Sequence, residues 1–217
     1  VRLLPVLEVL SVVIVMLALA MLLPLAVAFL YEDAARHAYG KGVGVTFVAG
    51  AALWIATRGN RAELQPRDGF LLVALVWTVL PAFATLPLLI YFPGLSFTDA
   101  YFETVAAVTT TGSTVLSGLD KLPPSINFWR CELQWLGGMG IIVLAVAILP
   151  LLGVGGSQIM KAETPGPMKD TKLTPRITET AKGLWLVYGI MTVACALVFK
   201  AVGMTWFDAV VHSFSTM

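Results

Sequence analysis

The sequence predicts an all-α membrane protein, and its composition is the first observation behind that prediction. Of the 217 residues, 58% are hydrophobic and 12% are charged, and the mean hydropathy is +0.86. Soluble domains contain about 45–50% apolar and about 25% charged residues. A chain this poor in charge cannot cover a water-facing surface, so lipid is its expected solvent. The net charge of +1 offers no electrostatic basis for binding nucleic acid.

The second observation is a series of apolar segments. A helix needs about 20 mostly apolar residues to span a bilayer, and five segments suit this role: 3–30, 42–57, 70–92, 129–153 and 183–202. The first is longer than the apolar core of a signal peptide, about 7–15 residues, so we interpret it as a retained span. The second is short and is weakened by three glycines, Gly42, Gly44 and Gly50. Four prolines are expected to bend or end these helices, namely Pro5, Pro24, Pro81 and Pro87.

The distribution of basic residues predicts the orientation in the membrane. The links 58–69 and 154–182, together with Arg2, hold nine of the fourteen Lys and Arg residues. Connections rich in Lys and Arg stay in the cytoplasm. We therefore expect both links to be cytoplasmic, and residues 31–41 and 114–125 to lie on the opposite face, where the remaining basic residues, Arg130 among them, are counted.

A short apolar segment at 97–108 does not fit a spanning helix. With about 10–12 apolar residues it is too short to cross a bilayer and is typical of a re-entrant helix. Asp99 is expected to cap this helix. Glu103 suits the helix dipole in the first turns, or adds negative potential at a pore mouth, and the sequence leaves both roles open.

The four residues that follow, Thr109-Thr110-Thr111-Gly112, are expected to leave the helix as an extended strand. Threonine is a poor helix former, and Gly112 permits backbone angles that threonine avoids. Non-helical backbone is tolerated at membrane depth only where it is buried in protein or lines a watery cavity. A short helix followed by such a strand is the architecture of a cation filter, whose carbonyls replace the hydration shell of the ion. On this stretch alone, a threonine-rich outer loop is an equal alternative.

An internal repeat with an offset of 109 residues favours the filter. Without a gap, the offset aligns Pro66-Arg67 with Pro175-Arg176, Gly94 with Gly203, Asp99-Ala100 with Asp208-Ala209, and Thr104 with Ser213. A fixed period indicates a modular architecture, here of helix–pore loop–helix repeats with re-entrant pore helices and an extended selectivity-filter strand. The second repeat is expected to stop at Met217 just before its own filter, so the chain alone should not conduct.

Glycines in the segment 129–153 predict close helix packing. Gly137, Gly138 and Gly140 lie within it, and small residues let neighbouring elements approach each other in membranes. We expect this helix to approach the filter strand, and the glycines at 153–156 to mark its end.

Five stretches of the sequence carry a family resemblance. They are Thr109–Gly112, Gln134–Val143, Leu152–Gly156, Lys161–Pro167 and Arg176–Lys182. Together they resemble the TrkH/TrkG/KtrB superfamily of potassium uptake proteins, and most closely its TrkH branch. The resemblance covers nearly the whole chain. It implies four fused repeats around one K⁺ pore, preceded by two extra helices that residues 3–57 match.

The resemblance also implies the function and the partners. It implies potassium uptake across the bacterial inner membrane by a multi-pass protein, with K⁺ as the transported ion and no enzymatic activity. Proton symport is often attributed to the family. A cytosolic nucleotide-binding regulatory subunit of the TrkA type is implied as a partner, and we expect a homodimer. The filter lacks the Val-Gly-Tyr-Gly of tetrameric potassium channels, which is normal for this superfamily.

The repeat and the resemblance together point to the ion site. Thr110 and Thr111 are the first choice as K⁺ ligands through their carbonyl oxygens, and Thr109 and Gly112 complete the set. We expect four parts in the chain: two N-terminal transmembrane helices at 1–57, the first helix–pore loop–helix repeat at 58–156, a cytoplasmic link at 157–182, and the start of the second repeat at 183–217.

Two other functions stand as alternatives. A subunit of an oligomeric K⁺ channel would contain the two-helix unit once, and the 109-residue repeat argues against it. An intramembrane serine hydrolase would use Ser113 or Ser117 with His212, but the sequence has no nucleophile motif such as GxSxG. Cys131 and Cys195 have no CxxC or Cys/His spacing, so we expect neither a disulfide nor a metal site from them.

Overall fold

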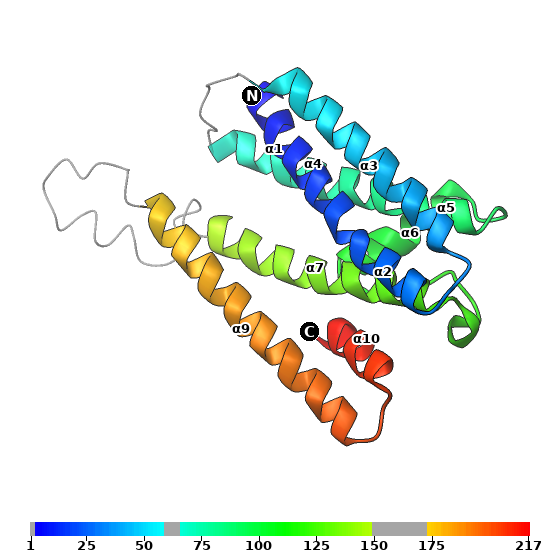
Figure 1. Cartoon of the computed structure of the whole chain (residues 1–217). Helices are drawn as coiled ribbons and strands as arrows, with labels where there is room; N and C mark the ends of the chain where they lie inside the picture. Colours follow the sequence, from blue (N-terminus) through cyan, green and yellow to red (C-terminus); the bar gives the residue numbers. More distant parts are fainter. Residues whose placement is uncertain (1–2, 59–65, 149–172) are drawn as a thin grey trace, which may run out of the picture. The chain divides into compact units, whose positions relative to one another are not determined.

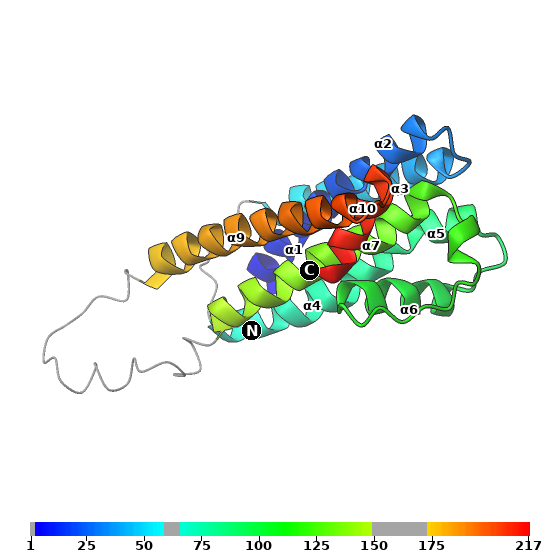
Figure 2. The same ribbon diagram turned by 90° about the horizontal axis from the view of Figure 1, so that it is seen from below.

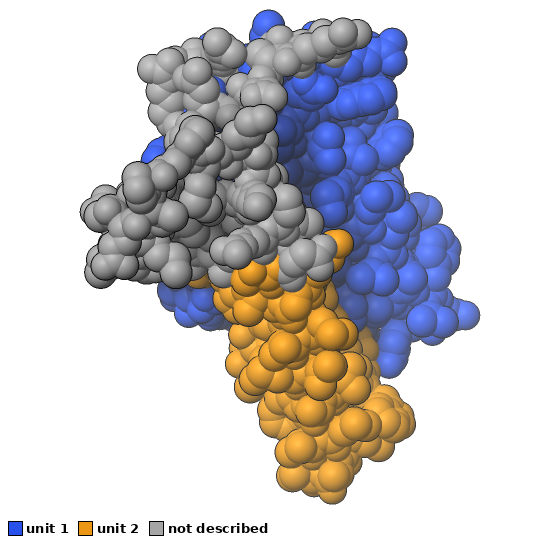
Figure 3. Space-filling model, turned by 90° about the vertical axis from the view of Figure 1, so that its left-hand side faces the viewer, with its two compact units in different colours: residues 1–134 blue, residues 135–217 orange. Residues whose placement is uncertain are grey.

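The computed structural model describes residues 3–58, 66–148 and 173–217. Within these ranges the chain forms helices joined by turns and loops, without a β-strand. The all-α fold class is therefore confirmed. The chain divides into two compact units, residues 1–134 and residues 135–217, which Figure 3 shows as space-filling surfaces. The boundary between them falls within the long helix α7 (Pro124–Ile148).

The first predicted span, 3–30, is formed by two consecutive helices, α1 (Leu3–Ala20) and α2 (Leu22–Leu30). Proline has no N–H to offer to the carbonyl four residues earlier. Pro24 therefore leaves the carbonyl of Ala20 without its usual partner, and α1 ends at that residue. The break at Met21 is the local bend expected from the proline.

The second span is longer than predicted from its apolar residues. Helix α3 runs from Arg36 to Thr57, so it begins six residues before the predicted start at 42. Its 22 residues reach about 33 Å at 1.5 Å per residue, enough for a bilayer core. The apolar run starts later than the helix because the first turns of α3 hold Arg36, His37 and Lys41, which hydropathy does not count as apolar.

Two glycines of α3 mark close crossings with other helices. A Cβ atom on Gly50 would lie 2.8 Å from Cγ2 of Val15 in α1, and one on Gly42 would lie 3.1 Å from Cγ of Pro87. Helix α1 packs along α3 and also contacts α4 (Pro66–Ala84) (Figure 1). Two of the three glycines that weaken the span by composition therefore let its neighbours approach it.

The third predicted span, 70–92, is also interrupted once. Helix α4 ends at Ala84, and α5 (Leu86–Tyr91) begins after Thr85 with Pro87 in its first turn. The short helix α6 (Phe97–Val108) follows and lies next to α4, as Figure 2 shows. A single turn of 3₁₀ helix at Leu119–Lys121 then leads into α7.

Four stretches of the described residues are long and apolar enough to cross a membrane: Leu3–Leu30, Arg36–Thr57, Asp68–Tyr91 and Thr180–Ala201. The fifth predicted span, 129–153, starts inside α7 and continues past Ile148, beyond the described residues. The glycines at 153–156 and most of the basic links 58–69 and 154–182 also lie outside the described residues.

The core of the first unit joins α3, α4 and α7. Trp129 is fully buried, meets the Tyr39 ring edge-to-face at 6.5 Å, and donates its Nε1–H to the Ala84 carbonyl at 3.1 Å. The hydroxyl of Tyr39 donates to the Ser125 carbonyl at 3.0 Å. The polar atom of each aromatic side chain thus donates a hydrogen bond to a backbone carbonyl of a neighbouring helix, as is usual for buried Tyr and Trp.

The second unit contains the end of α7, α9 (Leu173–Ala201) and α10 (Trp206–Thr216). Trp135 donates to Oγ1 of Thr192 at 2.9 Å, and its carbonyl accepts from the Tyr188 hydroxyl at 3.0 Å. A Cβ atom on Gly138 would lie 2.8 Å from that hydroxyl. The predicted close packing at Gly138 is therefore present, but its neighbour is Tyr188 of α9.

Candidate functional site

Helix α6 occupies the predicted range 97–108, but its cap is a different residue from the one expected. The N-cap is Ser96, whose Oγ accepts from the Asp99 N–H at 3.1 Å and donates to Asp99 Oδ2 at 2.7 Å. Asp99 is the third residue of the helix and supports the cap from inside. The pattern is a variant of the capping box, in which the Asp99 carboxylate accepts from the Ser96 hydroxyl and not from its backbone N–H.

The start of α10 repeats this geometry. Thr205 accepts from the Asp208 N–H at 3.1 Å and donates to Asp208 Oδ2 at 2.7 Å. The two N-caps, at 96 and 205, are separated by 205 − 96 = 109 residues, the offset of the sequence repeat. The Ser/Thr-x-x-Asp pattern was present in the sequence at both places and was the signal that would have identified the caps.

The threonines that follow α6 form the hydrogen bonds that end the helix. Thr110 donates its N–H to the Ala107 carbonyl at 2.9 Å, and Thr111 donates to the Ala106 carbonyl at 2.9 Å. Thr110 has φ +57, in the left-handed region. These two bonds with a left-handed residue form a Schellman motif, in which glycine is the usual residue. Here a threonine occupies the position.

The extended conformation expected from Thr109 onward is therefore absent from the first two residues of the run. Thr109 has φ −81 and ψ 6, and Thr110 is left-handed, so both belong to the helix end. If the chain were extended from Thr109 onward, the last carbonyl groups of α6 would have no hydrogen-bond donors. In the observed conformation the two Schellman bonds supply these donors. The residues at 111–118 are non-helical, as predicted, and Gly112 has φ +71, which glycine adopts without strain.

The predicted ligand residues present an open backbone. Thr110, Thr111 and Gly112 are exposed, and among the described residues no hydrogen bond reaches the carbonyl oxygens of 109–112. A hollow of about 400 Å³ borders this segment along one side of α6, lined by Thr98, Tyr101, Phe102, Val105, Ala106, Thr109, Thr111 and Ser113. Carbonyl oxygens with no internal partner are available to a cation.

A buried carboxylate holds the part of the loop that follows Gly112. Glu103 is only 2% exposed and accepts from the Thr114 hydroxyl at 2.9 Å and from the Val115 N–H at 3.0 Å. The same carboxylate forms an ion pair with Nε of Arg130 on α7. The side chain of Glu103 therefore joins the short helix α6, the loop that follows it and helix α7.

The structure adds an ion pair to the two roles considered for Glu103 from the sequence. Glu103 lies within the first two turns of α6, as expected, but it is buried and paired with Arg130, so it is not a free charge at a pore mouth. Arg130 was counted among the basic residues of the outer face, and it is buried as well. Glu103 and Arg130 lie in separate apolar segments, so no local sequence pattern predicts that they form an ion pair.

Two hydrogen bonds fix α6 on α4. The Thr104 hydroxyl donates to the Pro81 carbonyl at 2.9 Å, and the Tyr101 hydroxyl donates to the Thr78 carbonyl at 3.0 Å. Thr104 is 1% exposed. The helix that carries the loop is thus held by α4 on one side and, through Glu103, by α7 on another.

The residues of the hydrolase alternative belong to different units. Ser113 and Ser117 are exposed loop residues of the first unit, whereas His212 stands on α10 in the second, edge-to-face against Phe199 at 6.2 Å. Neither cysteine forms a disulfide within the described ranges. Within the described ranges no group of three or more His, Cys, Asp or Glu side chains is placed to hold a metal ion.

Spanning helices combined with a half-length helix and an exposed carbonyl loop define a multi-pass membrane protein of the pore-loop class. The chain belongs to the TrkH family of cation transport proteins, which it matches over residues 35–217. It is 51% identical over 213 residues to the Trk system potassium uptake protein TrkH of Halomonas elongata, covering 98% of this chain and 44% of that protein. It is 53% identical to TrkH of Escherichia coli K12 over 198 residues, covering 91% and 41%.

A solved structure shares the fold. The crystal structure of the potassium transporter TrkH from Vibrio parahaemolyticus matches with a TM-score of 0.86 and 46% identity, covering 100% of this chain and 43% of that one. The chain thus spans less than half the length of the relatives it matches. The family resemblance is confirmed, and because the family is one of transport proteins, the hydrolase alternative is set aside.

Proposed function

We propose that this chain supplies one wall of a potassium pathway, in the loop at Thr109–Gly112. The observation that carries the proposal is the exposed backbone of this loop, whose carbonyl oxygens have no hydrogen-bond donor among the described residues. K⁺ sheds its water only where carbonyl oxygens replace it. The named relatives are potassium uptake proteins, which agrees with this ion.

The mechanism follows from what holds the loop. The left-handed Thr110 and the Schellman bonds set the direction in which the chain leaves α6. Glu103 then holds Thr114 and Val115, so the loop is fixed on both sides of Gly112. A loop fixed in this way keeps its carbonyls in position before the ion arrives, which lowers the free-energy cost of binding. Several such walls around an axis would complete the coordination.

The test uses the protein of which this chain is a part. Reconstituted in liposomes, it should carry K⁺ down a gradient, with Na⁺ flux well below K⁺ flux. The readout is ion flux against empty liposomes of the same lipid. Equal K⁺ and Na⁺ flux, or flux no greater than in empty liposomes, would remove the proposal.

A subunit of an oligomeric channel is the second candidate. The matching capping boxes at Ser96 and Thr205 favour fused repeats over a single two-helix unit. The chain on its own, reconstituted in liposomes, should therefore not conduct K⁺. Selective K⁺ flux from the isolated chain would instead favour the oligomeric channel.

The cellular location, the partner subunit and the oligomeric state are parts of the same proposal. We place it in the bacterial inner membrane with the links 58–69 and 154–182 in the cytoplasm, where a nucleotide-binding subunit of the TrkA type would meet it, and as a homodimer. The parts 1–57, 58–156, 157–182 and 183–217 remain the proposed organisation. Co-purification of such a subunit with the full protein, and its loss when 157–182 is replaced, tests the docking role of that link. Proton symport stays a prediction.

A further inference from the structure

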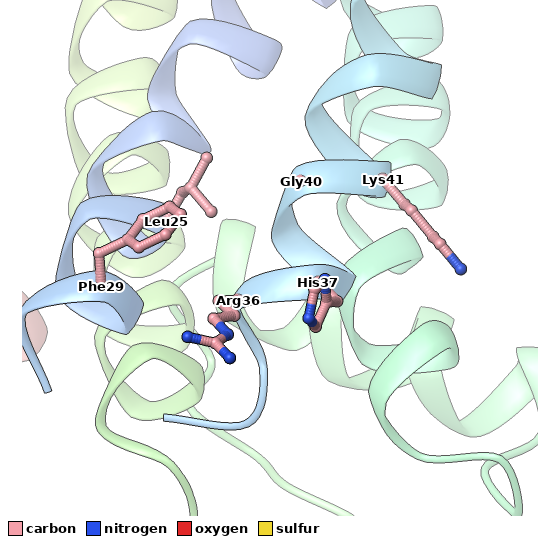
Figure 4. Close-up of a pocket in the computed structure, with 6 residues that line it drawn as sticks. All are labelled: Leu25, Phe29, Arg36, His37, Gly40 and Lys41. Atoms are coloured by element: carbon pink, nitrogen blue, oxygen red, sulfur yellow. The ribbon is translucent and has the colours of Figure 1, made fainter. Parts of the chain in front are cut away.

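A hollow of about 420 Å³ lies between α2 and α3, away from the proposed filter. Its lining is Leu25 and Phe29 from α2, and Arg36, His37, Gly40 and Lys41 from α3, as Figure 4 shows. All of these residues belong to the first unit. One wall is therefore apolar and the other carries nitrogen donors.

The nitrogen donors face outward from the protein without an internal partner. Among the described residues, neither Arg36 nor His37 has a hydrogen bond or ion pair. The nearby carboxylate of Asp33 is occupied, because it accepts from the N–H groups of Ala35 at 2.9 Å and Ser125 at 3.1 Å. Glu32 does not line the hollow. The guanidinium of Arg36 is thus available to an anion from outside the chain.

The apolar wall lies at the end of a membrane span. Phe29 is 62% exposed and Leu30 is 80% exposed, and both end the apolar stretch Leu3–Leu30. Arg36 opens the next spanning helix. At such a position hydrocarbon meets the headgroups, where cationic side chains extend toward the lipid phosphates.

We infer that this hollow binds an anionic phospholipid, with its phosphate on Arg36 and His37 and an acyl chain along Leu25 and Phe29. The planar guanidinium suits a phosphate group, which it can bind with two parallel hydrogen bonds. The exposed Phe29 and the half-buried Leu25 offer a contact to an occupant with an apolar part, which a free phosphate lacks.

The chain offers matched variants for a test. A Cβ atom on Gly40 meets nothing within 4 Å, so Gly40→Phe fills the hollow without displacing the backbone. Gly44, one turn further along α3, is equally open and does not line the hollow, so Gly44→Phe is its control. Lys121 is exposed and does not line the hollow, so Lys121→Gln is the control for Arg36→Gln with His37→Gln.

The experiment is native mass spectrometry of the purified chain in an uncharged detergent, titrated with phosphatidylglycerol or with phosphatidylcholine of the same acyl chains. We expect tighter binding of phosphatidylglycerol. Arg36→Gln with His37→Gln should weaken it about tenfold, the size expected for losing a hydrogen bond between charged groups. Gly40→Phe should weaken binding similarly, whereas Gly44→Phe and Lys121→Gln should bind within about twofold of the parent chain.

Three results would overturn the inference. The first is equal binding of the two lipids, and the second is unchanged binding in Gly40→Phe. The third is saturable binding of inorganic phosphate that competes with the lipid at equal concentration, which would indicate a site for a soluble anion. Size-exclusion profiles and far-ultraviolet circular dichroism establish that each variant keeps the parent fold.

Discussion

Thr110 shows how single residues shape the candidate filter. A β-branched residue at φ +57 is uncommon, and a residue in this region costs about 1–3 kcal/mol unless its surroundings hold it there. Two backbone bonds to the end of α6 supply that hold. Oγ1 of Thr109 and Oγ1 of Thr111 also lie 2.9 Å apart and add a hydrogen bond across it. The strain therefore lies at the predicted ligand position, where functional sites commonly store it.

Gly112 supports a prediction about transport. In the full protein, Gly112→Asp should nearly abolish K⁺ uptake while membrane insertion persists, because it adds a charge and strains a backbone at φ +71. Gly112→Ser should be milder and admit more Na⁺. Gly118→Ser is the control, since Gly118 has φ +65 with equally open space and lies outside the filter. K⁺ uptake assays should show a larger loss for the variants at Gly112 than for Gly118→Ser. Equal losses of uptake at the two positions would mean that backbone strain alone causes the effect.

The pair Glu103–Arg130 supports a second prediction at this scale. Glu103→Gln or Arg130→Gln alone should destabilise the chain by about 3–5 kcal/mol, because each leaves one buried charge without its partner. The double variant should be more stable than either single variant, since it removes both charges. Thermal unfolding in detergent measures all four proteins of this cycle. Additive losses in the double variant would contradict a direct pairing.

At the scale of helices, close crossings depend on the absence of a side chain. Gly50 sits where a Cβ atom would lie 2.8 Å from Val15 and 3.1 Å from Ile14. Gly44 of the same helix has nothing within 4 Å. The two glycines thus have opposite surroundings within one span, although composition treats them alike.

This contrast gives a prediction for α1 and α3. Gly50→Ala should destabilise the protein by about 1–3 kcal/mol, the usual cost of overpacking, because α1 must move away from α3. Gly44→Ala should be neutral or stabilising by up to about 1 kcal/mol, since alanine is the better helix former. Unfolding midpoints in one detergent compare them. A destabilised Gly44→Ala with an unaffected Gly50→Ala would disprove this crossing.

At the scale of the whole molecule, the orientation in the membrane awaits a direct test. The burial of Arg130 removes one basic residue from the outer face and so strengthens the charge bias behind the proposed orientation. Asp120 and Arg58 are exposed at opposite ends of the proposed topology. They are the natural positions for a labelling experiment.

The prediction is made in a background where Cys131 and Cys195 are replaced by serine. Asp120→Cys should react with a membrane-impermeant thiol reagent in intact cells, because its loop is proposed to lie outside. Arg58→Cys should react only after the membrane is opened. Reversed labelling of the two sites would invert the topology and with it the cytoplasmic placement of the basic links.

Sequence reasoning located the short helix well and its supports poorly. The bounds 97–108 followed from a run of apolar residues too short to span, which is a local property. The cap was assigned to Asp99 when it is Ser96, although the capping pattern was readable within four residues. The start of α3 was missed because its first turns are polar. The pairing of Arg130 with Glu103 joins residues 27 positions apart, which no local pattern encodes.

The sequence by itself determined the membrane class, the approximate positions of four spans, the repeat of 109 residues and the glycine at position 112, because each depends on composition or on sequence patterns. The tertiary structure decided which polar groups meet. It buried Glu103 against Arg130, turned Thr110 into the left-handed closure of α6, and placed Gly50 against α1. These depend on distances between helices, and helices pack through the shapes of whole surfaces.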